Sequence, residues 1–131
     1  MRKRLTLVVM RLLLSANLLY GAIFLKFAGV PGALAVFTQM SYAFHGFISQ
    51  PVFRLGSGVF ETVVAVLLLI PKTARVGVEL TTVWMTVVIL SHIFVLGYDG
   101  FFVDALVMAV LAIGYLLLTR GQPVRFEQGN S

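Results

Sequence analysis

The sequence predicts an all-α fold: a four-helix transmembrane bundle with a short interfacial or re-entrant helix between the first and second spans. Three observations predict it. The chain is 60% hydrophobic and 11% charged, and its mean hydropathy of +1.00 is typical of an integral membrane protein. Four apolar runs are each long enough to cross a hydrocarbon core roughly 30 Å thick. Basic residues flank these runs in the pattern that orients membrane proteins.

The four expected spans cover about residues 5–27, 51–71, 76–96 and 101–119, followed by a tail over residues 120–131. A chain of this length has room for one small bundle, so we expect a single membrane domain. The amino-terminal run has the basic start of a secretory signal, but Arg11 interrupts it and no cleavage site precedes a polar chain. We therefore expect an uncleaved first span. Residues 126–131 are expected to be disordered.

Basic residues predict the orientation of the spans. They gather at one side of the expected membrane, as Arg2, Lys3, Arg4, Lys72, Arg75, Arg120 and Arg125. The loops at the other side carry no Lys or Arg apart from the boundary residues Lys26 and Arg54. The positive-inside rule then predicts a multi-pass membrane protein with both termini in the cytoplasm. The net charge of +5 comes from these flanks, so nucleic-acid binding is not expected.

The long connection over residues 28–50 carries no Lys, Arg, Asp or Glu but several large apolar side chains. A solvated loop would leave those side chains exposed to water. Pro31 is suited to the first turn of a helix, so we expect an interfacial or re-entrant helix from about Pro31 to Phe44, lying over the outer mouth of the bundle. His45 is interpreted as a residue at headgroup level in preference to a ligand or proton carrier.

Charged residues inside the spans form two layers when each is placed by its distance from the span end. Near the inner side lie Arg11 and Glu79. Glu79 pairs either with Arg75, four residues earlier on the same helix, or with Arg11 of the first span at a similar depth. Arg11 itself either reaches an acid on a neighbouring helix or extends to the inner headgroups.

The outer layer contains Lys26, Arg54, His92 and Asp104, with Glu61 nearer the middle of the membrane. A charge there costs roughly 2.5–3.5 kcal/mol unless it faces a partner or a watery cavity. Because the two bases balance the two acids when His92 is neutral, this layer can be buried without net charge. The four spans each contribute a member, as expected if all face one axis.

Two interpretations of the outer layer remain open. In one, interhelical pairs only fix the packing and register of the bundle. In the other, Lys26, Arg54, Glu61, His92 and Asp104 line a ligand-binding pocket open to the outer leaflet and covered by the helix of residues 31–44. Glu61 would exchange a proton with a lipophilic ligand, His92 would relay protons, and Arg54 would orient an oxygen.

Several short segments resemble the DoxX-like family of small four-span membrane proteins. They are Lys26-Phe27-Ala28-Gly29-Val30-Pro31 with Phe37, Phe53-Arg54 with Gly58 and Glu61, the run LLLIPKTARVG from Leu67 to Gly77, and Met85 with His92. The resemblance covers about residues 12–118, and Arg54 to Glu61 with the Pro-Lys-Thr connection carries most of its specificity. Lys26, Arg54, Glu61 and His92 are the matched motif residues; Asp104 is added from its depth alone.

The resemblance implies a membrane component of an oxidoreductase complex, since some DoxX-like proteins are so described and the related DoxD type is a subunit of a thiosulfate:quinone oxidoreductase. Distant eukaryotic relatives act in receptor assembly and secretory cargo export. The resemblance implies a protein of the bacterial inner (plasma) membrane. Its expected function is that of a quinone-interacting subunit of a redox or stress-response complex, with a redox protein partner or a homo-oligomer. The alternatives are a non-enzymatic protein that binds or transports a lipophilic small molecule, and a membrane assembly factor.

The chain also limits the chemistry available to it. It has no cysteine, so thiol exchange and thiolate metal sites are excluded, and electrons must come from a partner protein or a quinone. It has no HExxH motif, no paired histidines at metal spacing, no serine-nucleophile motif and no phosphate loop. Neither a metal site nor hydrolytic or nucleotide chemistry is therefore expected.

Overall fold

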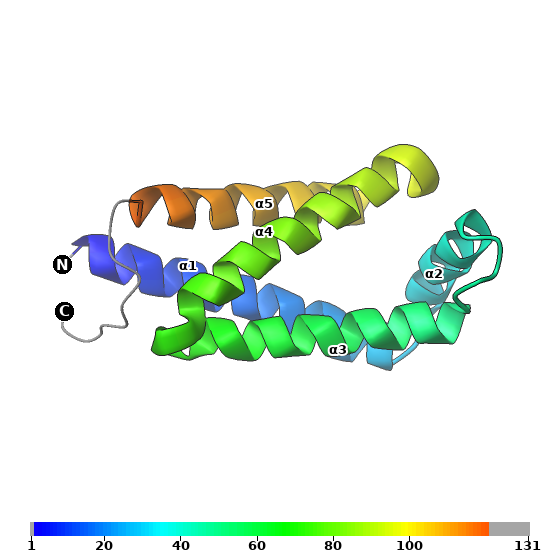
Figure 1. The fold of residues 1–131 in the computed structure, drawn as a ribbon, viewed down its shortest axis with the longest axis horizontal. Coiled ribbons are helices and arrows are strands. Elements are labelled where there is room, and N and C mark those ends of the chain that lie inside the picture. The colour runs from blue at the N-terminus through cyan, green and yellow to red at the C-terminus, as the bar shows by residue number, and fades with distance from the viewer. Residues whose placement is uncertain (1, 121–131) are drawn as a thin grey trace.

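The structure is a computed structural model that describes residues 2–120. The expected disorder of residues 126–131 and the basic residue Arg125 lie outside the described residues. Helices account for almost all of the described chain (Figure 1). They are α1 (Arg2–Leu19) with its π-helical continuation η1 (Tyr20–Phe27), α2 (Pro31–Ala43), α3 (Gln50–Leu69), the 3₁₀ turn η2 (Pro71–Thr73), α4 (Ala74–Ser91) with its π-helical continuation η3 (His92–Leu96), and α5 (Gly100–Leu118).

Four of these segments are long and apolar enough to cross a membrane: Lys3–Phe27, Gln50–Leu69, Pro71–Leu96 and Gly100–Leu118. The predicted all-α four-span fold is confirmed, and so is the short helix between the first and second spans, which is α2. The third span begins at Pro71 and not near residue 76, because Pro71 opens a 3₁₀ turn that leads directly into α4. The chain therefore has the build of a multi-pass membrane protein.

The four spans pack in a ring. α3 lies against α1 on one side and α4 on the other, while α5 lies against α4 and α1. Figure 1 shows the start of α1, the α3–α4 connection and the end of α5 at one end of the bundle, with α2 and the α4–α5 connection at the other. We call the end with α2 the outer end and the opposite end the inner end, following the expected orientation.

Prolines and one carboxylate set several helix starts. Pro31 and Pro51 each stand in the first turn of their helix, where the missing N–H costs no intrahelical bond. Asp99 caps α5, and its carboxylate accepts a hydrogen bond from the Phe102 backbone N–H at 3.0 Å. Gly97, at φ 85°, lies between η3 and this cap, in a backbone conformation that favours glycine. The outer connection between α4 and α5 is therefore short and well defined.

The inner half of the bundle is tightly packed. Its buried side chains include Leu14, Val64, Leu68, Val78 and Met108. A Cβ at Gly77 would lie 3.0 Å from the Leu68 backbone nitrogen, so glycine lets α4 approach α3 closely. The hydroxyl of Ser15 donates to the Ala65 carbonyl at 3.0 Å, which joins α1 to α3.

The inner charges resolve the alternatives left open for Glu79. Its carboxylate lies 3.7 Å from the Arg75 guanidinium, so the local pair along α4 is confirmed. The cross-bundle pair of Arg11 with Glu79 is wrong. Arg11 instead donates to the backbone carbonyl of Leu68 at 2.7 Å, near the end of α3, where the last carbonyls have no intrahelical donor.

Candidate functional site

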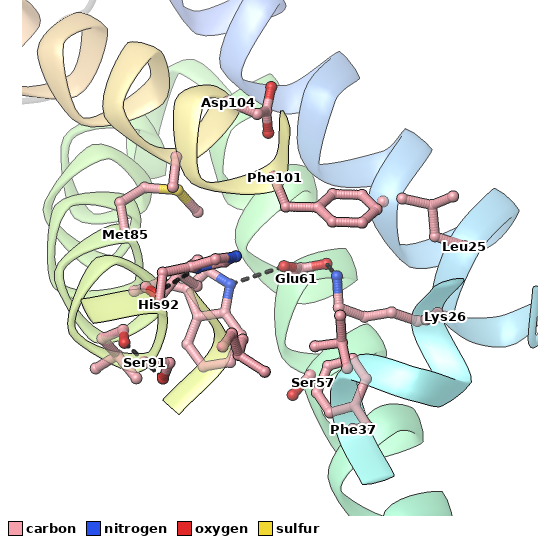
Figure 2. Close-up of a pocket in the computed structure, with 18 of the residues that line it drawn as sticks. Leu25, Lys26, Phe37, Ser57, Glu61, Met85, Ser91, His92, Phe101 and Asp104 are labelled. Atoms are coloured by element: carbon pink, nitrogen blue, oxygen red, sulfur yellow. Dashed lines mark hydrogen bonds and ion pairs between the residues drawn. The ribbon is translucent and has the colours of Figure 1, made fainter. Parts of the chain in front are cut away.

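A cavity of about 210 Å³ lies in the outer half of the bundle. All five α-helices or their π-helical continuations contribute to it, and α2 forms one wall through Ala33, Val36, Phe37 and Met40. The walls are mostly apolar, and Figure 2 shows how the labelled residues surround the space. The polar side chains that line it are Asn17, Lys26, Ser57, Glu61, Trp84, Ser91, His92 and Asp104.

Glu61 is the centre of the polar part of this cavity. It is 5% exposed; Lys26 Nζ donates to its Oε1 at 2.8 Å and Trp84 Nε1 donates to its Oε2 at 2.7 Å. These three side chains come from η1, α3 and α4. Because a buried carboxylate is stable only when it is paired and hydrogen-bonded, the cluster satisfies Glu61 and joins three helices. We call these three residues the Glu61 cluster.

A glycine leaves room for the cluster. A Cβ built at Gly21 would lie 3.5 Å from both Glu61 Oε1 and Lys26 Nζ, which is ordinary van der Waals contact. Larger side chains at this position would compete with the ion pair for space. Gly21 therefore lies directly beside the two charged atoms of the pair.

Two π-helical segments set the direction of side chains that line the cavity. Lys26 lies in η1, and His92 is the first residue of η3. In η3 the Gly97 N–H donates to the His92 carbonyl at 2.8 Å, a bond that spans five residues. Such segments widen the helical turn and change the direction of the side chains that follow, and they are frequent at functional sites. Both π-helical segments lie at the outer ends of spans that line the cavity.

His92 is buried at 3% exposure. Its Nδ1 lies 2.9 Å from the Val88 carbonyl oxygen on the same helix. Its Nε2 lies 3.3 Å from Asp99 Oδ1, but without hydrogen-bond geometry, so this nitrogen has no hydrogen-bond partner within residues 2–120. His92 thus brings a nitrogen without a partner to the cavity.

Arg54 does not line the cavity, although it was expected to. Its guanidinium donates to the backbone carbonyl of Lys26 at 2.5 Å and to Gln50 Oε1 at 3.0 Å. The Lys26 carbonyl lies at the end of η1, where the helix supplies no donor. Arg54 therefore holds the outer end of the first span in place, next to the residue that reaches Glu61.

Asp104 also lines the cavity, and its side-chain partner is an amide. Asn17 Nδ2 donates to Asp104 Oδ1 at 2.7 Å. Of the four charged residues whose charges were expected to balance, Lys26 and Glu61 form an ion pair, whereas Arg54 bonds to a carbonyl and an amide. Lys26, Glu61, His92 and Asp104 do share one cavity, as predicted for the pocket.

A groove of about 420 Å³ adjoins the cavity between η1 and the start of α5. The residues that line both spaces are Asn17, Gly21, Leu25, Phe101 and Asp104. In Figure 2 the Phe101 ring points from α5 toward Leu25. The groove also reaches Tyr20 and Asp99, which are both exposed. It connects the cavity with the surface of the bundle.

Trp84 and Asn17 are site residues to which the sequence analysis gave no role in the pocket. A signal for Trp84 existed: it lies in the middle of the third span, as Glu61 lies in the middle of the second, and its indole N–H needs an acceptor in an apolar environment. His45, by contrast, is exposed, follows α2 and does not line the cavity.

A scan against models of protein families, a search of curated proteins and a search of solved structures each gave no match. Among residues 2–120, no three His, Cys, Asp or Glu side chains gather as metal ligands would. The geometry of the site is thus the main source for its chemistry: an apolar cavity in the outer half of the bundle, with an ion pair on one side and a partnerless imidazole nitrogen on another.

Proposed function

We propose that this chain is a DoxX-like membrane protein that binds a lipophilic molecule through a polar head group, and that a quinone is the ligand class. The single observation that carries the proposal is the Glu61 cluster on the wall of an otherwise apolar cavity. Ligand sites commonly combine apolar walls with a few placed polar groups. A head group with an apolar ring and polar oxygens has the matching chemistry.

The size of the cavity supports a head group and not a whole lipid. Pockets that enclose a drug-sized ligand typically measure about 300–1,000 Å³, and this cavity measures about 210 Å³. A longer ligand would extend through the groove between η1 and α5. Its tail would then meet the bilayer beside the first span.

Lys26 is the residue that would orient the ligand. Its ammonium carries three N–H donors, and one of them goes to Glu61. The remaining donors suit a carbonyl or hydroxyl oxygen of the head group. Phe37 from α2 lies beside the ammonium, with its ring centroid 6.0 Å from Nζ, and offers an aromatic face against which a flat ring would stack.

A redox role would place the protein in a complex with a partner that supplies electrons, since the chain has no thiol. The expected proton-handling residues are Glu61 and His92. Both Glu61 oxygens already accept hydrogen bonds, which supports a role in holding Lys26. The Nε2 of His92 has no hydrogen-bond partner among residues 2–120, which supports contact with the ligand. The basic residues at the inner end support a cytoplasmic inner end in the plasma membrane.

A non-enzymatic binding or transport protein would use the same cavity without electron transfer. Redox difference spectra of added quinone, with and without the protein, separate these two functions. A third function, membrane assembly, gains support from the hydrogen bonds that both Glu61 oxygens accept, because these bonds join three helices without a ligand.

The decisive experiment compares wild type with Glu61→Gln, each purified gently from its native membrane. Native mass spectrometry followed by lipid extraction should show a quinone-class molecule on the wild type and its loss from Glu61→Gln, because the variant no longer balances the Lys26 charge. Glu79→Gln is the matched control: it makes the same change at an exposed carboxylate at the inner end, and ligand should be retained.

Two results would contradict ligand binding. One is wild-type protein that carries no specific small molecule and takes up none when quinone is added. The other is Glu61→Gln protein that unfolds in mild detergent while the wild type shows no ligand, which would identify the Glu61 cluster as a purely structural element.

A further inference from the structure

We infer that the cavity selects the reduced, hydroxyl-bearing form of the head group, a quinol, over the corresponding quinone. This inference rests on the proposed function and names the form of the ligand that the site prefers. The two forms share a ring and differ at their oxygens: a quinone oxygen only accepts hydrogen bonds, whereas a quinol hydroxyl also donates. The question is therefore which kind of partner the polar residues of the cavity still need.

The contact between His92 and Val88 determines what His92 needs. A backbone carbonyl oxygen accepts and never donates, so the Nδ1 that lies 2.9 Å from the Val88 oxygen must carry the hydrogen. In the neutral imidazole the other nitrogen, Nε2, is then an acceptor. That nitrogen is buried and has no hydrogen-bond partner among the described residues. It therefore needs a donor.

The polar groups around His92 do not supply this donor. Asp99 offers a carboxylate oxygen 3.3 Å from Nε2, which forms an ion pair only with a protonated imidazole and is a second acceptor beside the neutral one. The Ser91 hydroxyl already donates to the Val87 carbonyl, and no other side chain among residues 2–120 donates to Nε2. An unsatisfied buried acceptor carries a free-energy cost. A ligand hydroxyl that donates to Nε2 removes this cost, and a quinone carbonyl does not.

The opposite side of the cavity accepts either form. Figure 2 shows the Lys26 ammonium and the His92 ring on opposite sides of Glu61. Lys26 has donors beyond the one given to Glu61, and these suit a carbonyl or a hydroxyl oxygen equally. The discrimination thus comes from the His92 side. A quinol that accepts from Lys26 with one oxygen and donates to His92 with the other satisfies both.

A neutral hydroxyl also suits the cavity better than a charged ammonium would. The walls are mostly apolar, and the desolvation of a full charge costs much more than that of a hydroxyl. The one ammonium in the cavity, Lys26, is already balanced by a buried carboxylate. The cavity therefore binds a neutral hydroxyl at a smaller desolvation cost than a charged ammonium.

The test measures the affinity of the full chain in lipid nanodiscs for three probes: a benzoquinone with a short alkyl tail, its quinol, and the dimethyl ether of that quinol. The ether has the quinol ring but no hydroxyl hydrogen. The quinol is kept reduced with excess dithionite, which alters no protein thiol or disulfide because the chain has no cysteine. We expect the quinol to bind about tenfold more tightly than the quinone or the ether, the factor that matches about one hydrogen bond.

Two variants assign the preference to His92. His92→Phe keeps a ring but removes the acceptor, and should bring the three affinities within about twofold of each other. His45→Phe is the matched control, since it makes the same change at an exposed histidine that does not line the cavity; the preference should persist. His92→Gln, which retains an acceptor oxygen, should keep part of it.

The outcomes separate this inference from the proposed function. Equal wild-type affinities for quinol and ether overturn the quinol preference but leave quinone-class binding intact. A preference that survives in His92→Phe overturns the role of His92. If the wild type binds none of the three probes, the proposed function fails as well. The comparison of probes needs only wild-type protein, so it stands even if His92→Phe does not fold.

Discussion

The inner and outer halves of the bundle are built from the same four spans but differ in how they satisfy polar groups. In the inner half, Ser15 and Arg11 donate to backbone carbonyls of α3, and small residues such as Gly77 bring the helices together. In the outer half, charged side chains from different helices meet around a cavity. Side chains that donate to the backbone of a neighbouring helix allow close packing, whereas side chains that bond to one another across the bundle leave space between the helices.

The two halves also differ in helix geometry. Both π-helical segments lie at the outer ends of spans, and α2 covers the same region. A wider turn costs regular hydrogen bonding and is retained where it positions a functional group. The inner half thus supplies most of the packing stability, and the outer half supplies the site.

Among variants that test the difference between the two halves, the largest expected loss of stability comes from a change in the inner core. Leu68 is fully buried, so Leu68→Ala should lower the free energy of unfolding by roughly 2–5 kcal/mol, since it leaves a void. The matched control is Val36→Ala in α2, which lines a space that is already open and should destabilise the fold less than half as much. Thermal unfolding in mild detergent, followed by circular dichroism, measures both; equal losses would contradict the division into a packed half and an open half.

A smaller effect is expected within the Glu61 cluster. Trp84→Phe removes the indole donor to Glu61 but keeps an aromatic ring against Phe60. Hydrogen bonds to charged groups are worth roughly 1.5–3 kcal/mol, so a loss of stability in this range is expected. A double-mutant cycle with Glu61→Gln tests the coupling. Additive losses would show that the hydrogen bond adds nothing and that Trp84 acts by packing alone.

The smallest effect is expected at the inner surface. The Arg75–Glu79 pair is 3.7 Å apart and partly exposed, so Glu79→Gln should change the stability by less than about 0.5 kcal/mol. The same unfolding measurement applies. A loss as large as that of Trp84→Phe would show that the inner charges hold the helices together as the Glu61 cluster does.

Much of the fold was predictable because its signals are local. Span length follows from the hydropathy of about 20 consecutive residues, and Pro31 marks the start of α2. For the site, the depth of each charged residue correctly grouped Lys26, Glu61, His92 and Asp104. Depth did not predict partners: Arg54 and Arg11 both donate to backbone carbonyls, an acceptor that is present at every residue and leaves no mark in the sequence.

What the sequence by itself determined is therefore the number of spans, their bounds within a few residues, the helix between the first two, and the set of ionisable groups at each depth. Only the tertiary structure decided which groups meet. The partner of a side chain depends on how each helix is rotated about its axis and which helix lies beside it, and a single π-helical turn changes that rotation. For this reason Trp84, and not Arg54, completes the hydrogen bonding of Glu61.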